Sequence, residues 1–342
     1  MEKTNTLTSA VRDEVLLRQT ILGPTTSFDL RLQQTVADDI LAGSLAFSRD
    51  GQYFATGQSI DEVRPKLLVF ETSNFDHPKW TFSFESEEDT QRRIARGDRK
   101  VDNGFRALCF SPNSRWLAAG TRFGKVLVYD LTDPGASPRK LDVLEDSEVS
   151  KVQFSHDGRR LYAHTVGRRI KQWKNFEQEV SRDLNIRDFA VDETGNRIIV
   201  LPGNGVLQFY ADLGEPSVAY APGSRFSAPQ MTPGFSGFIA CCTGQLVIAG
   251  ADSSTQIFDL RTSVKSNELF SRAPMSAPAF EGRYLFSPGP DWLRIWDTTS
   301  NHLLYELPVT ARHRAIAALD PSGCFFAFRS GGPFNCTNVV NQ

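Results

Sequence analysis

Residues 152–173, VQFSHDGRRLYAHTVGRRIKQW, contain the pattern that decides the fold. The segment begins with a short apolar run, Val152-Gln153-Phe154, and continues into the polar pair Asp157-Gly158. Asp-Gly supplies the positive φ angles that a two-residue hairpin turn needs. A second apolar stretch and a loop follow, and a third stretch ends at Trp173. The segment therefore predicts three antiparallel strands, of which the third ends in an aromatic residue.

The same unit recurs along the chain. Its turns are Asp50-Gly51, Asn113-Ser114, Asp157-Gly158, Thr194-Gly195, Thr243-Gly244, Glu281-Gly282 and Ser322-Gly323. Its aromatic landmarks are Phe70, Tyr129, Trp173, Phe209, Phe258, Trp296 and Phe334. Most intervals between landmarks lie near the roughly 40–45 residues of a four-stranded propeller blade. Turns and aromatic residues that keep step in this way predict a repeat architecture.

Several copies of the unit resemble the WD-repeat family. Leu293–Asp297 ends in the Trp-Asp dipeptide that names the family, and Val128–Asp130 and Ile257–Asp259 are similar to it. The turns at Ser48–Gly51 and Ser155–Gly158 resemble the first hairpin of the family's repeat. The sequence departs from the family because no Gly-His dipeptide opens any unit. We therefore expect the family's side-chain hydrogen-bond network to be partial, and packing to contribute more of the stability.

The resemblance extends over residues 28–342. It implies an all-β fold, a seven-bladed β-propeller of four-stranded antiparallel blades. We expect one domain over residues 13–342 and a flexible N-terminus over residues 1–12.

The ring of blades also has to be closed. Few residues follow Phe334, so the last blade lacks an outer strand from its own part of the chain. Phe28–Leu32 alternates apolar and polar residues, which is typical of a half-buried strand. In the family an N-terminal strand commonly completes the last blade, and we expect residues 28–36 to do so. Other outer strands are expected at residues 79–84 and 302–307.

Composition and charge argue against several functional classes. Lys plus Arg number 38 against 40 Asp plus Glu, and the net charge is −2. Nucleic-acid binders usually carry a basic domain or stripe, so a nucleic-acid partner is not expected. The first residues contain acids and no apolar core, unlike a signal peptide. No run of about 18 apolar residues predicts a membrane span. We expect an intracellular protein, cytoplasmic or nuclear, that is not secreted.

Catalytic and metal-binding motifs are missing from the sequence. The five cysteines form no CxxC pair, and no HExxH, G-x-S-x-G, Walker loop or GxGxxG occurs. We expect no enzymatic activity, no cofactor, no metal and no small-molecule substrate. The alternative is a propeller-fold hydrolase, which would need several oxygen ligands at the mouth of the channel. The expected inner-strand starts include a single acid; they are Ser44, Ala107, Lys151 and Asp188.

Residues 85–104, ESEEDTQRRIARGDRKVDNG, are rich in charge and join an outer strand to the next inner strand. In WD-repeat proteins this loop lies on the face that usually binds partners. Two interpretations stay open, a mobile solvated loop and a docking loop. The loop at residues 59–65 is expected on the same face, and Trp292 on a Pro-Gly-Pro loop. The candidate partner-binding residues are Asp61, Glu62, Arg64, Arg92, Arg93, Arg96, Arg99, Lys100, Arg122, Arg168, Trp292 and Arg312.

The function that follows is a non-catalytic scaffold, a subunit of a larger complex that binds one or more proteins or peptides through its loop face. Residues 247–261, VIAGADSSTQIFDLR, also resemble the motif of propellers that recruit substrates to cullin ubiquitin ligases. A substrate receptor of such a ligase is therefore an alternative. The motif overlaps the ordinary repeat pattern, which makes a structural role for these residues the simpler interpretation.

Overall fold

We describe the fold from a computed structural model. The described residues are 28–36, 42–58, 65–83, 104–122, 124–142, 147–166, 169–183, 186–192, 197–202, 207–214, 218–219, 238–242, 244–249, 254–260, 264–270, 279–281, 283–288, 292–308, 316–321, 325–329 and 334–341. Their regular secondary structure consists of β-strands. Within these ranges, no helix is long and apolar enough to cross a membrane.

The described strands form seven four-stranded sheets, and all pairings between neighbouring strands are antiparallel. The first three sheets each use four consecutive strands. They contain β2 (Ala42–Phe47), β3 (Tyr53–Gln58), β4 (Lys66–Glu71) and β5 (Trp80–Ser83); β6 (Phe105–Phe110), β7 (Trp116–Thr121), β8 (Lys125–Asp130) and β9 (Arg139–Asp142); and β10 (Val149–Phe154), β11 (Arg160–Thr165), β12 (Arg169–Lys174) and β13 (Gln178–Asp183).

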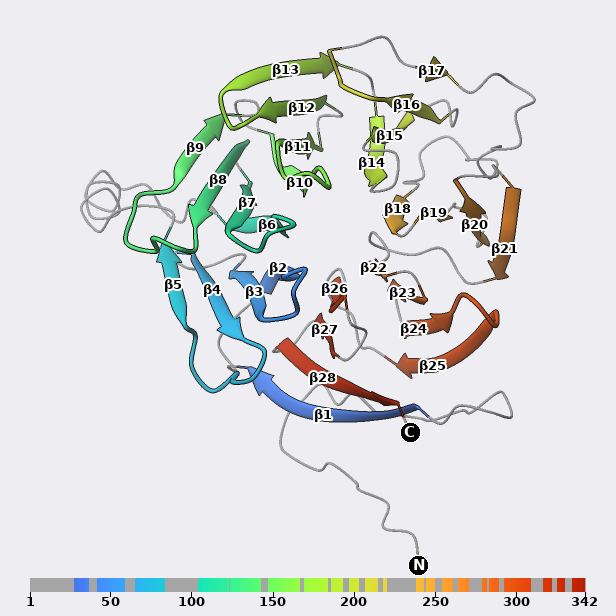
Figure 1. The fold of residues 1–342 in the computed structure, drawn as a ribbon. Helices are drawn as coiled ribbons and strands as arrows, with labels where there is room; N and C mark the ends of the chain where they lie inside the picture. The colour runs from blue at the N-terminus through green and yellow to red at the C-terminus, as the bar shows by residue number, and fades with distance from the viewer. Residues whose placement is uncertain are drawn as a thin grey trace, which may run out of the picture.

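The next three sheets repeat the same order. They contain β14 (Ile186–Asp192), β15 (Arg197–Pro202), β16 (Gln208–Tyr210) and β17 (Val218–Ala219); β18 (Phe238–Cys242), β19 (Gln245–Ala249), β20 (Ser254–Asp259) and β21 (Val264–Phe270); and β22 (Ala279–Glu281), β23 (Tyr284–Pro288), β24 (Trp292–Asp297) and β25 (His302–Pro308). The sheets are arranged in a ring, with the first strand of each sheet innermost (Figure 1).

The seventh sheet combines the two ends of the described chain. Its order is β26 (Ile316–Leu319), β27 (Phe325–Arg329), β28 (Phe334–Asn341) and β1 (Phe28–Val36). In the β1–β28 pair, Phe28 lies opposite Asn341 and Val36 lies opposite Phe334, with one shift of register between Leu32 and Gln34. Figure 1 shows β1 and β28 side by side at the edge of the ring.

The prediction of an all-β chain built from four-stranded antiparallel sheets is confirmed. The expected outer strands at residues 79–84 and 302–307 correspond to β5 and β25. The prediction was wrong at the last landmark, because Phe334 is the first residue of β28 and not near its end. Phe334 follows the Ser322-Gly323 turn more closely than the other landmarks follow their turns, and this spacing does not indicate where β28 begins.

One hydrogen-bonding pattern explains the recurring hairpin turns. The Ser48 hydroxyl donates to the Asp50 carboxylate at 2.6 Å, and it accepts a hydrogen bond from the Tyr53 amide at 2.8 Å. Ser155 makes the same two bonds around Asp157 and Gly158. Gly51 and Gly158 have φ angles of 69° and 68°. The Ser-x-Asp-Gly sequence therefore encodes the turn, because the Asp carboxylate accepts a hydrogen bond from the Ser hydroxyl and Gly adopts the left-handed backbone conformation without strain.

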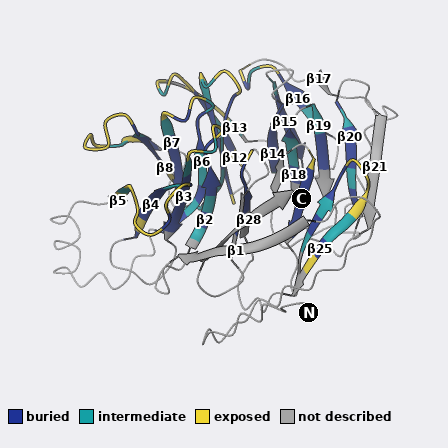
Figure 2. Cartoon of the chain, turned by 60° about the horizontal axis from the view of Figure 1, so that its bottom comes forward, coloured by how far each residue is buried: buried dark blue, intermediate teal, exposed yellow. Residues whose placement is uncertain are grey.

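The core lies between neighbouring sheets. Five aromatic landmarks are buried: Phe70, Tyr129, Trp173, Phe209 and Phe258. Tyr129 illustrates their role, because its ring lies 4.5 Å from that of Phe82 in the preceding sheet. Figure 2 shows that buried residues follow the strands, whereas exposed residues collect in the turns. Each sheet is thus covered on its faces by its neighbours, which is why the landmark positions call for large apolar side chains.

Two glycines allow neighbouring sheets to approach closely. A Cβ atom on Gly57 would lie 2.5 Å from the Cβ of Phe105, and a Cβ on Gly120 would lie 2.5 Å from Cγ1 of Val149. Gly57 and Gly120 each lie on the second strand of a sheet, while Phe105 and Val149 each begin the first strand of the next. A side chain at either glycine would push the next sheet away.

Substitution Gly120→Ala is expected to lower the free energy of unfolding by about 1–3 kcal/mol, because the added methyl group overpacks the contact with Val149. Gly135→Ala is the matched control, since its Cβ would lie 3.9 Å from the nearest atom. The measurement is urea unfolding followed by tryptophan fluorescence. Equal losses in the two variants would contradict the role assigned to this contact.

Candidate partner-binding surface

Most of the predicted partner-binding residues fall outside the part of the chain that the structure describes. These residues are Asp61, Glu62, Arg64, Arg92, Arg93, Arg96, Arg99, Lys100, Arg168 and Arg312. Residues 1–12, and the charged segment 85–104 apart from Gly104, lie outside it as well. Arg122 and Trp292 are the two candidates within the described ranges.

Arg122 lies in the turn between β7 and β8 and is exposed. Its backbone amide donates a hydrogen bond of 3.2 Å to the carbonyl of Gly104. Gly104 is the last residue of the charged segment and immediately precedes β6. The structure therefore brings Arg122 to the point where the charged segment enters its sheet. The bond extends the pairing of β6 with β7 by one step, since Phe105 lies opposite Thr121.

The next sheet repeats this arrangement at Val166. Its amide donates to the carbonyl of Glu148 at 2.9 Å, and its side chain is 61% exposed. No other large hydrophobic residue of the described chain is classed as exposed. Val166 is not among the residues predicted from the sequence. An apolar residue between a predicted strand and the polar pair Gly167-Arg168 was the signal that could have found it, since exposed apolar side chains often mark contact sites.

Trp292 does not lie on a loop. It is the first residue of β24, and its Cα partner across the sheet is Pro308 of β25. The prediction placed it on the loop because Pro288-Gly289-Pro290 punctuates the sequence. The pairing of β24 with β25 begins at Trp292, so the strand starts closer to this punctuation than the sequence suggests.

A lysine connects three sheets along their inner strands. Lys151 on β10 donates from Nζ to Asp188 Oδ1 on β14 at 3.0 Å, and to the Ile239 carbonyl on β18 at 3.0 Å. It also donates to the Phe189 carbonyl at 2.6 Å. Asp188 in turn accepts from the amides of Phe189 and Ile239, both at 2.8 Å. This group of contacts, the Lys151 clamp, neutralises and fully hydrogen-bonds a buried carboxylate.

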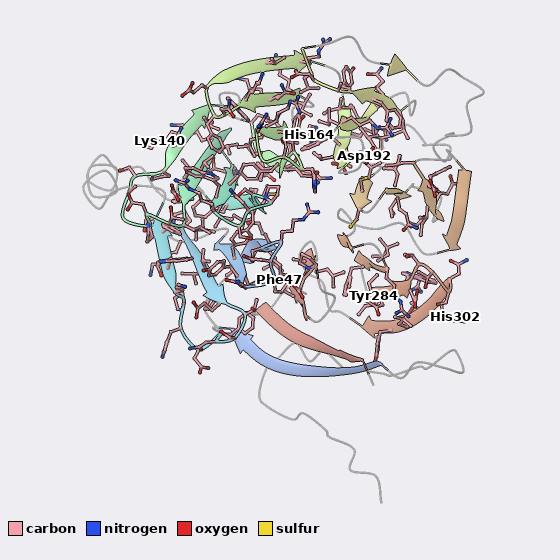
Figure 3. All side chains as sticks on the ribbon, in the orientation of Figure 1. Phe47, Lys140, His164, Asp192, Tyr284 and His302 are labelled. Carbon is pink, nitrogen blue, oxygen red and sulfur yellow. The ribbon has the colours of Figure 1, made fainter. Side chains whose placement is uncertain are left out.

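His164 is a buried neighbour of the clamp. Burial lowers its pKa to about 4, and the charge of Lys151 acts in the same direction, while Asp188 opposes the shift. The ring nitrogen Nδ1 lies 3.0 Å from the Ser150 hydroxyl. Figure 3 shows His164 in the inner part of its sheet. The side chain is therefore neutral at pH 7, and it contributes packing and one hydrogen bond.

Asp188, the one acid among the four expected inner-strand starts, has a structural role. Both oxygens of Asp188 accept hydrogen bonds, and Lys151 provides its counter-charge. In the described ranges, no group of three or more His, Cys, Asp or Glu side chains could hold a metal ion. The carboxylate that a hydrolase of the predicted alternative type would use here holds sheets together.

The described residues of the segment 247–261 have the structure of an ordinary repeat unit. It contributes to β19 and β20, where Leu246 pairs with Phe258 and Val247 with Ile257. Phe258 and Leu260 are buried in the core. Apolar side chains of the motif are therefore occupied in packing between sheets.

Comparison with known proteins identifies the fold. No family model matches the chain, and no curated protein matches it in sequence. A chain of the mitotic checkpoint complex is 14% identical, with a TM-score of 0.64 over 98% of this chain and 99% of that chain. The β-propeller domain of Cps50 (Swd1) from Myceliophteria thermophila is 14% identical, with a TM-score of 0.68 over 91% of this chain and 100% of that chain. The propeller fold implied by the sequence resemblance is therefore confirmed.

Substitution Lys151→Met should lower the free energy of unfolding by about 2–3 kcal/mol, because it leaves the buried Asp188 carboxylate without its counter-charge. The side chain of Lys151 is 23% exposed, which keeps the expected loss below that of a fully buried pair. Arg115→Met removes the exposed ion pair with Asp130 and should cost less than about 1 kcal/mol. Chemical denaturation at pH 7 measures both, and similar losses would show that the clamp contributes no more than a surface ion pair.

Proposed function

We propose that this chain is a non-catalytic interaction platform, a β-propeller of the WD-repeat type that binds one or more proteins or peptides as a subunit of a larger complex. The observation that carries the proposal is the hydrogen bond between Arg122 and Gly104. It ties the exposed β7–β8 turn to Gly104, the last residue of the charged segment, and this supports the proposal that the turn and the segment share one contact surface. Similarity to a chain of the mitotic checkpoint complex agrees with a role in an assembly.

The physical basis is the division between a fixed framework and variable connections. Strands packed face to face hold the turns in place, and the turns are free to carry contact residues. Arginine, the residue type of the exposed Arg122, is enriched at interfaces, where it forms several directed hydrogen bonds. Val166 adds an exposed apolar side chain at the same end. Partner binding at this face also requires no catalytic group.

The location proposed for the protein is intracellular, in the cytoplasm or the nucleus. Cys109, Cys241 and Cys242, among the described residues, are not joined in disulfides. Free thiols of this kind are typical of reducing compartments, where disulfides rarely persist.

We also propose that the seven sheets are the seven blades of a closed propeller. The register of β1 against β28 supports it, because the two strands pair over eight positions. In a closed ring every sheet has neighbours on both sides, and closure leaves only short edges.

Replacement of residues 86–100 by a short Gly-Ser linker is expected to remove the main partners of the protein without changing its thermal midpoint. The segment is proposed to supply contact residues and no core. Affinity purification with mass spectrometry, compared with the full-length chain, measures the outcome. A chain that begins at residue 13 is the control and should retain its partners. An unchanged partner list after the replacement would refute the assignment of the loop face.

A chain that begins at residue 38 lacks β1 and should be less stable by at least about 3 kcal/mol, because the eight positions paired with β28 lose net hydrogen bonds of about 0.5–1.5 kcal/mol each. The β28 amides should also exchange faster with deuterium. Both measurements use the chain that begins at residue 13 as reference. If β28 exchanges at the same rate in the two chains, β1 does not close the ring.

A further inference from the structure

An arginine between two aromatic rings stands out on the opposite end of the sheets. The Arg139 guanidinium lies 5.4 Å from the centroid of the Trp116 ring and 5.4 Å from that of the Phe176 ring. The two rings pack edge to face at 5.3 Å. Trp116 and Phe176 are half-buried against the core, whereas Arg139 is exposed. Because two rings hold the guanidinium, its donors are fixed in direction and face solvent.

A second arginine at the same tryptophan, Arg115, is paired with a carboxylate. Arg115 lies 4.7 Å from the Trp116 centroid, and it donates to the Asp130 carboxylate from Nη2 at 2.7 Å and from Nε at 3.2 Å. These hydrogen bonds lower the pKa of Asp130. Within the described residues, Arg139 contacts the two rings and has no carboxylate partner. The pair therefore leaves one positive charge satisfied and one available.

The position of this group separates it from the loop face. Trp116 begins β7 and Arg122 follows its end, so about 20 Å of extended chain lies between them at roughly 3.4 Å per residue. Arg139 begins β9, where it pairs with Val128 near the end of β8. Phe176 lies in the β12–β13 turn of the next sheet. The group thus bridges two sheets at their hairpin-turn end.

We propose that Trp116, Arg139 and Phe176 form a second contact surface, which binds an aspartate or glutamate side chain of an acidic peptide segment in a protein partner. The planar guanidinium forms two parallel hydrogen bonds to a carboxylate, and the aromatic rings pack against the adjoining methylene groups. Binding goes beyond the function proposed above, because it gives the platform contacts at both ends of its sheets.

Charge selects a carboxylate as the ligand. The neighbouring turn carries both Lys174 and Glu177, which are exposed and offset each other, and Asp130 offsets Arg115. The Arg139 guanidinium has no carboxylate partner among the described residues, and one carboxylate would match its charge and planar geometry. Phosphopeptides and nucleic acids carry a denser negative charge and are bound through several basic groups.

The test measures fluorescence anisotropy of a short fluorescein-labelled peptide of alternating Glu and Gly with the full chain. Arg139→Ala should weaken binding about tenfold, the value of one charge-assisted bidentate contact. Arg139→Lys should lose most of the affinity as well, because an ammonium lacks the planar fork. Lys140→Ala is the matched control. Lys140 is the next residue on the same edge strand, and its side chain points to the other face of the sheet. The substitution removes the same charge as Arg139→Ala. Figure 3 shows Lys140 on the outer rim.

Three comparison ligands complete the experiment: the same peptide with Gln in place of Glu, one with phosphoserine in place of Glu, and single-stranded oligothymidine. The Gln peptide should not bind, and the other two should bind more weakly than the Glu peptide. Equal weakening by Arg139→Ala and Lys140→Ala, or tighter binding of the phosphoserine peptide or the oligothymidine, would overturn the proposal. A chain with residues 86–100 replaced should bind the Glu peptide normally, so failure at the loop face and failure here are distinguishable.

Discussion

Burial of apolar surface between neighbouring sheets is the constraint on which the rest of the molecule depends. A four-stranded sheet with two apolar faces cannot cover them alone, and each sheet in the ring is covered by the next. The spacing between sheets is set where Gly57 and Gly120 face Phe105 and Val149. Aromatic residues such as Tyr129 fill the space between the third strands. Because this packing fixes the strands, the turns at both ends are held in defined places.

Local features of the structure could be predicted from the sequence, and features formed by distant residues could not. The Ser-x-Asp-Gly turn at Ser48–Gly51 carries its own hydrogen bonds, so a few consecutive residues determine it. The expected order of loops placed Arg122 and the charged segment on one face, but the hydrogen bond between Arg122 and Gly104 was not predicted. Trp292 was misplaced because the Pro-Gly-Pro loop was expected to extend further, into what is the start of β24, and Phe334 was misplaced because its repeat is degenerate. Nothing in the sequence reveals that Phe176 lies against Arg139, since the two residues belong to different sheets.

Polar groups between the sheets add specificity to the packing. The Lys151 clamp joins the third, fourth and fifth sheets through one ammonium group. In another contact between sheets, Gln172 of β12 donates to Asp212 at 2.8 Å and accepts from the Leu213 amide at 3.1 Å, both in the turn after β16. Buried groups of this kind cost much energy when a partner is lost, so they favour one order and spacing of the sheets over others. Their value lies in defining the arrangement more than in strengthening it.

The pairing of β1 with β28 has a consequence for biosynthesis. Residues 28–36 leave the ribosome early, but their partner, residues 334–341, is synthesised only after about 300 further residues at roughly 5–20 residues per second. During that interval β1 has an unsatisfied edge, of the kind that pairs with other chains. The intervening six sheets can form from consecutive strands while they emerge. Completion of the seventh sheet then waits for residues 334–341, so a chain that terminates before them cannot pair the edge of β1.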